Sequence, residues 1–74
     1  MGVMEPKEFW EDAKWGREHY AELQERYKDQ WVAIVDKRVV SYGKNLKKVE
    51  EEAKKLTKKE HIYTTFVESG AAIY

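Results

Sequence analysis

Apolar and aromatic residues recur along the first third of the chain at alternating spacings of four and three positions. They are Phe9, Ala13, Gly16, Tyr20, Leu23 and Tyr27. At about 100° per residue they fall within about 40° either side of one line, which is typical of an amphipathic helix. Pro6 suits the first helical turn, where its missing N–H would have no partner. The spacing predicts one continuous helix from about residue 6 to 28, with Tyr20, Leu23 and Tyr27 buried.

Two short runs rich in β-branched residues follow, residues 31–36 (WVAIVD) and residues 38–42 (RVVSY). Such runs so close together predict a β-hairpin. If Asp36 and Lys37 form a two-residue loop, Lys37 needs a positive φ. A looser turn is an equal alternative. In the tight register the expected cross-strand pairs are Val35 with Arg38, Ala33 with Val40, and Trp31 with Tyr42.

A second helix is predicted from the cap residue Asn45 to about residue 56, and a last strand over residues 61–67. The apolar stripe of this helix is Leu46, Val49, Ala53 and Leu56. A right-handed strand–helix–strand crossover makes its two strands parallel, and the apolar first strand is best placed between them. The predicted fold class is α+β, with element order α-β-β-α-β and a three-stranded antiparallel sheet of order 2-1-3. Two helices pack on this sheet, on one face or on both.

The length of 74 residues predicts a single domain over residues 1–74, with flexible ends at 1–5 and 69–74. Domains this small have thin cores and commonly rely on disulfides, metals or oligomerisation. The chain has no cysteine and two histidines, which removes disulfides and leaves oligomerisation as the expected support. No stretch is long and apolar enough for a membrane span, and no signal region opens the chain, so we expect a cytoplasmic protein. A single Asn, no Cys and abundant Lys and Glu are typical of heat-adapted proteins.

Candidate catalytic groups do not form a recognisable pattern. Glu50, Glu51 and Glu52 are consecutive, so on a helix they point about 100° apart and cannot converge on one ion. The four glycines stand alone, which excludes a glycine-rich phosphate loop. We therefore predict no catalytic residue, no cofactor and no metal ligand, and a protein that is not an enzyme.

The charge is balanced, with 14 basic and 14 acidic residues. A dedicated nucleic-acid binder needs excess basic charge to neutralise phosphates. The one basic concentration comprises Lys44, Lys47, Lys48, Lys54, Lys55, Lys58 and Lys59, and the acidic residues 50–52 dilute it. A solvated helix face is favoured, and weak nucleic-acid binding by these lysines is the alternative function.

The chain has an excess of aromatic residues, and these are more informative about function than its charged residues. Trp10 and Trp15 lie on the flanks of the first helical stripe, where either the rest of the chain or a partner must cover them. Both faces of the predicted sheet are apolar, so either the helices divide between the faces or another chain closes one of them. The favoured function is a small protein–protein interaction module, as a homodimer or the minor partner of a larger protein. The expected partner-binding residues are Trp10, Trp15, Trp31 and Tyr42.

The segment 31–36, followed by Arg38-Val39-Val40 and Gly43, resembles a family of very small uncharacterised archaeal and bacterial proteins. Their hairpin signature is Trp-Val-Ala-(Val/Ile)-Val-Asp. The resemblance covers roughly residues 20–67. It departs at Lys37, where the family tends to have Gly or Asn, and in the aromatic segment before His19. It implies a hairpin-plus-helix fold and names no activity or site.

Overall fold

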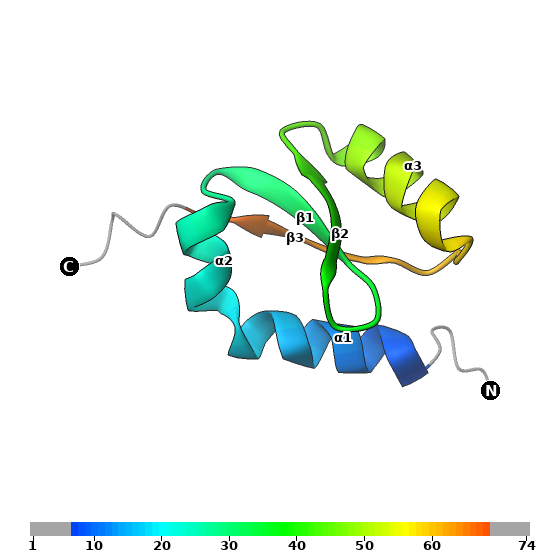
Figure 1. Ribbon diagram of the computed structural model, residues 1–74, viewed down its shortest axis with the longest axis horizontal. Helices are drawn as coiled ribbons and strands as arrows, with labels where there is room; N and C mark the ends of the chain where they lie inside the picture. The colour runs from blue at the N-terminus through cyan, green and yellow to red at the C-terminus, as the bar shows by residue number, and fades with distance from the viewer. Residues whose placement is uncertain (1–6, 69–74) are drawn as a thin grey trace.

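The computed structural model describes residues 7–68 and contains three helices and three strands (Figure 1). In chain order they are α1 (Lys7–Glu18), α2 (Tyr20–Arg26), β1 (Gln30–Ile34), β2 (Val39–Gly43), α3 (Leu46–Thr57) and β3 (Tyr63–Val67). The predicted α+β class is confirmed, but the predicted count of two helices is wrong, because the first helical segment is split. The predicted flexible ends, 1–5 and 69–74, lie outside the described residues.

The sheet has the predicted order β2-β1-β3, with β1 antiparallel to both neighbours. β1 takes the centre because it is apolar on successive residues, and a central strand is buried on both faces. Val32, Ala33 and Ile34 all have 0% exposed surface. Helix α3 connects the two outer strands, which run parallel to each other on either side of β1.

The helices divide between the two faces of the sheet (Figure 1). On one face, α1 and α2 cover a core cluster of Leu23, Val32, Ile34 and Val67, with Trp15, Tyr27, Val39 and Tyr63 packed against it. On the other face, α3 covers Ala33, Val49 and Ala53, with Trp31, Val40 and Ile62 at their border. Alternate residues of β1 therefore supply two thin cores. In the described part of the chain, no whole face is left for another chain to close.

The continuous helix predicted for residues 6–28 breaks at His19, and α2 turns away from the axis of α1 (Figure 1). His19 has φ −108° and ψ 19°, outside the helical region. Its Nδ1 lies 2.9 Å from the carbonyl oxygen of Trp15, which also accepts the His19 backbone N–H at 3.0 Å. Such a local side-chain bond competes with regular helix geometry. The bend brings Leu23, which is 3% exposed, against the sheet, while Tyr20 and Tyr27 are half-buried.

Of the two alternatives for the hairpin, the structure has the two-residue turn. Val35 and Arg38 exchange both backbone hydrogen bonds, at 2.9 and 3.2 Å. The two loop residues between them, Asp36 and Lys37, have φ of 54° and 60°. Positive φ at both positions is the type I′ geometry, which matches the twist of the flanking strands.

Beyond the turn the predicted register is wrong, because a β-bulge lies between Ala33 and Ile34. Val40 is the extra residue, and the observed pairs are Ile34 with Val39, Ala33 with Ser41, Val32 with Tyr42 and Trp31 with Gly43. The bulge turns Val40 and Ser41 toward the same face, where the Ser41 hydroxyl donates to Glu52 of α3 at 3.2 Å. A bulge is invisible to simple alternation, since it adds a residue to only one strand.

Helix α3 begins as predicted. The Asn45 side-chain oxygen accepts the Lys48 backbone N–H at 3.1 Å, which caps the amino end. The helix ends at Thr57, and the C-cap residue Lys58 has the left-handed φ of 61°. Leu56, predicted on the buried stripe, is instead 64% exposed. The angular pattern places it at the flank of the stripe next to Glu52, beyond the narrow surface that a three-stranded sheet offers to the helix.

Candidate interaction surface

The four aromatic residues predicted to bind a partner do not form one patch. Trp10 is 59% exposed and contacts the ring of Phe9 edge-to-face at 5.3 Å. Trp15 is half-buried, packs against the core cluster under α1 and α2, and stacks on His19 at 4.4 Å. Residues of the same chain therefore cover much of Trp15, whereas Trp10 keeps most of its surface in solvent.

The bulge separates the other two predicted residues. Tyr42 is 58% exposed and lies against Tyr27 on the face covered by α1 and α2, with ring centroids 4.8 Å apart. Trp31 lies on the opposite face, at the border of the α3 core. Its ring contacts Phe66 of β3 edge-to-face at 5.4 Å. Trp31 and Tyr42 would have shared a face in the predicted register.

A strip of sheet beside α3 stays open. Helix α3 packs mainly against β2 and β1, so the same side of β3 is largely without a helical cover. Side chains of this strip come from alternate residues of β3 and from the adjacent end of β1. We call it the Trp31–Phe66 surface, and it comprises Trp31, Ile62, Thr64 and Phe66. Phe66 is 38% exposed and the other three are half-buried.

Sequence reasoning did not select Phe66 as a partner-binding residue. In a strand over residues 61–67, Phe66 and Ile62 are four positions apart and so share a face, but this spacing does not show that α3 sits over β2 and β1. Helix placement across a sheet depends on packing between distant segments, which local periodicity does not encode.

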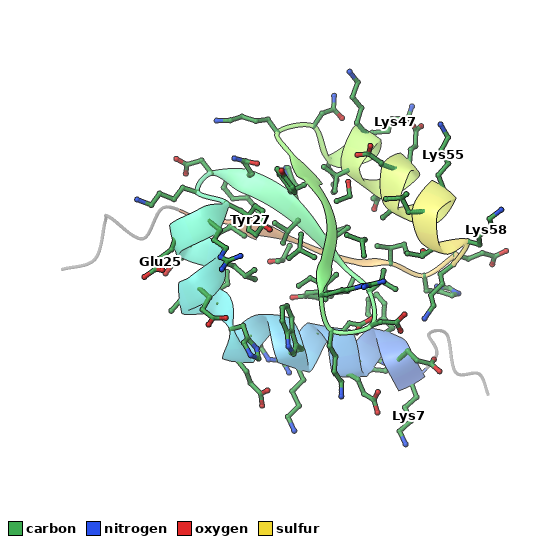
Figure 2. All side chains as sticks on the ribbon, in the orientation of Figure 1. Lys7, Glu25, Tyr27, Lys47, Lys55 and Lys58 are labelled. Carbon is green, nitrogen blue, oxygen red and sulfur yellow. The ribbon has the colours of Figure 1, made fainter. Side chains whose placement is uncertain are left out.

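The α3 lysines predicted for the alternative function are all exposed. Figure 2 shows Lys47 and Lys55 pointing outward from α3, and Lys58 just beyond its end, away from the sheet. Lys44 precedes the helix, and Lys48 and Lys54 lie within it. Residues 50–52, all glutamate, lie on the same helix, so its surface carries both signs of charge.

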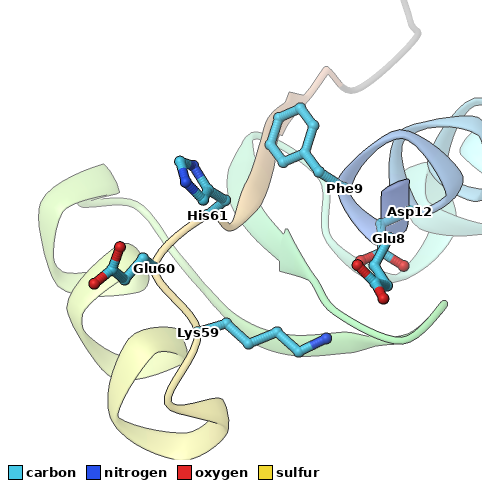
Figure 3. Close-up of a pocket in the computed structure, with 6 residues that line it drawn as sticks. All are labelled: Glu8, Phe9, Asp12, Lys59, Glu60 and His61. Carbon is cyan, nitrogen blue, oxygen red and sulfur yellow. The ribbon is translucent and has the colours of Figure 1, made fainter. Parts of the chain in front are cut away.

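A small cleft of about 370 Å³ lies between the start of α1 and the loop that leads into β3 (Figure 3). Glu8, Phe9, Asp12, Lys59, Glu60 and His61 line it. Within residues 7–68, no three His, Cys, Asp or Glu side chains are placed to hold a metal ion. The cleft therefore mixes charges of both signs and has no clustered donor set.

Asp12 of this cleft has a structural task that the sequence did not reveal. It is 5% exposed, and its two carboxylate oxygens accept the backbone N–H groups of Asp36 at 3.3 Å and Lys37 at 2.9 Å. The carboxylate thus holds the hairpin turn against α1. Nothing local in the sequence distinguishes Asp12 from the solvated acids around it.

Residues 22–70 match the model of a family of unknown function, DUF5678. The chain belongs to this family. The match contains the sheet, α3 and most of α2, whereas α1 and its Asp12 precede it. Searches of curated proteins and of solved structures gave no match to the chain.

The match bears out that the chain belongs to a family of unknown function, and it assigns no activity. Within the part of the chain that the structure describes, none of the helices combines the length and apolar character needed to cross a bilayer.

Proposed function

We propose that this DUF5678 protein is a small protein–protein interaction module that self-associates through the Trp31–Phe66 surface. The observation that carries the proposal is the uncovered strip of β3 beside α3, where Phe66 is 38% exposed. Trp31 and Phe66 form an aromatic pair beside α3. Such a pair is typical of a surface that another protein covers, because aromatic residues are enriched at the centres of interfaces.

Two further features support self-association over binding by charge. The chain has no net charge, so copies approach without long-range repulsion. Its two cores are also thin, and a domain of this size gains from additional buried apolar surface. Trp10 and Tyr42 lie away from the Trp31–Phe66 surface and are not needed for this association.

Sedimentation velocity from low micromolar to roughly 500 µM tests the proposal, since this range brackets weak dimers. We expect the mass to rise from 8.8 kDa toward twice that value with concentration. Phe66→Ser should shift the transition to higher concentration. Leu56→Ser is the matched control, because Leu56 is 64% exposed but lies outside the Trp31–Phe66 surface.

Circular dichroism establishes that both variants remain folded. A protein that stays at 8.8 kDa over the whole range excludes self-association. Equal association of the Phe66→Ser variant and the wild type would show that a different surface is used.

A further inference from the structure

The outer edge of β3 has backbone groups that the sheet does not use. The Val67 carbonyl accepts the Asp29 N–H at 2.7 Å, so it points toward β1. The Phe66 carbonyl accepts the Tyr20 hydroxyl at 3.3 Å, on the other side of the strand. Successive residues of a strand direct their backbone groups to opposite edges. The N–H and C=O of Thr64 and the N–H of Phe66 therefore point away from β1.

The two edges of the sheet are protected to different degrees. Edge strand β2 contains the bulge at Val40, which disrupts pairing with a further strand. Edge strand β3 pairs with β1 without a register shift. Its sequence, Tyr63-Thr64-Thr65-Phe66-Val67, has no charge, no Pro and no Gly. Charges, Pro and bulges are the usual means of preventing edge-to-edge pairing, and β3 has none of them.

Tyr20 covers only the carboxyl end of this edge. Its hydroxyl donates to the Phe66 carbonyl at 3.3 Å and accepts the Glu68 N–H at 3.0 Å. No hydrogen-bond partner from residues 7–68 is found for the outward groups of Thr64. The accessible part of the edge is therefore centred on Thr64.

We propose that β3 pairs with β3 of a second copy, antiparallel, about a two-fold axis at Thr64. This inference rests on the proposed self-association and specifies its geometry. A two-fold axis places Thr64 opposite Thr64 of the second copy, where the two residues exchange N–H to C=O bonds. It also places each Phe66 opposite Ile62 of the other copy, because the two residues lie two positions either side of Thr64.

We expect a second copy of the chain to pair with this edge of β3, because the Trp31–Phe66 surface is self-complementary. Phe66 of β3 and Ile62, which directly precedes this strand, both lie on the α3 side of the sheet, so the axis sets each aromatic ring beside an aliphatic side chain. Cross-strand aromatic–aliphatic pairs of this kind stabilise sheets. β3 itself carries no charge. Beyond the strand the same pairing sets Glu60 opposite Glu68, and both of these residues are exposed. The two Trp31–Phe66 surfaces then form one continuous strip across a six-stranded sheet.

Thr64→Pro tests the edge directly. Proline removes the outward N–H of Thr64 and puts its ring where the second strand would lie, but it removes no bond to β1. We expect a folded variant whose dimer dissociation constant rises at least about tenfold, the loss expected for one or two backbone hydrogen bonds. Thr64→Val, which keeps the N–H and the shape of the side chain, should dimerise like the wild type.

Amide hydrogen exchange of the wild-type chain provides a second measurement that does not need a folded proline variant. The Thr64 N–H should become protected as concentration rises through the dimer transition. The Thr65 N–H, which points toward β1, should be protected at all concentrations.

A dimer in which Thr64 exchanges equally fast at all concentrations would overturn the edge pairing and leave the proposed self-association intact. A chain that remains monomeric at all concentrations would overturn both.

Discussion

Replacing Asp12 with alanine is expected to lower the free energy of unfolding more than the removal of any other single charged side chain near the surface. The Asp12 carboxylate is almost fully buried and accepts two backbone N–H groups of the hairpin turn, at 2.9 and 3.3 Å. Both donors, Asp36 and Lys37, hold positive φ, which costs a non-glycine residue about 1–2 kcal/mol. Their bonds to α1 offset this strain.

The magnitude follows from the geometry. Hydrogen bonds to charged groups contribute about 1.5–3 kcal/mol each, and the longer of these two is weak. Asp36 and Lys37 are exposed, so water recovers part of the loss when the acceptor is removed. We therefore expect Asp12→Ala to cost about 2–4 kcal/mol. At roughly 0.05–0.15 kcal/mol per residue, the whole domain has only about 4–11 kcal/mol of stability.

Urea unfolding followed by tryptophan fluorescence measures this cost. Asp12→Asn keeps one oxygen acceptor and should lose about half as much. Lys59→Ala is the control, because it removes the exposed ion pair with Asp36 at 3.4 Å and should cost less than about 1 kcal/mol. A loss below about 0.5 kcal/mol for Asp12→Ala would refute the view that the carboxylate holds the turn.

Other predictions address the core, the helix packing and the alternative function. Leu23→Ala should cost about 2–5 kcal/mol by urea unfolding, and a variant within about 0.5 kcal/mol of wild type would show that Leu23 is not core. Gly16→Val should also destabilise, by roughly 2 kcal/mol or more, because even a Cβ at this position would lie 3.0 Å from the Ile34 side chain; an unchanged midpoint would contradict the close packing of α1. For nucleic acid, we expect that the protein does not bind a labelled duplex with an affinity that falls steeply as the salt concentration rises. A steep salt slope that Lys47→Glu and Lys55→Glu together abolish would instead establish the lysine function.

The order of the sheet, the presence of a hairpin and the start of α3 were accessible from the sequence because each rests on a local signal. The unbroken apolar run of β1 indicates a strand buried on both faces, hence a central one. The two strand-like runs lie so close together that they indicate a hairpin, although the sequence left a two-residue turn and a looser turn as equal alternatives. Asn45 marks the start of α3 because a side-chain cap acts within three residues.

The features that escaped prediction depend on contacts between distant segments. The break at His19 is stabilised by its own bond to Trp15, but the helical stripe continues through it and conceals it. The bulge at Val40 serves the packing of α3, which is not visible from the hairpin sequence alone. Asp12 bonds to residues that follow it by 24 and 25 positions, and no local pattern signals a contact over that distance.

The residues that α1 buries determine how readily this helix separates from the sheet. The buried residues of this helix are Asp12, Ala13 and Gly16, all of them small or polar. The apolar surface that α1 buries comes mainly from the half-buried Phe9 and Trp15 and from the sheet residues beneath them, which is less than the whole domain buries. We therefore expect the free energy of opening α1 to lie below that of global unfolding. The break at His19 lets α1 detach while α2 stays packed through Leu23. We therefore expect a partly open native state in which α1 alone has left and the sheet residues beneath it face water.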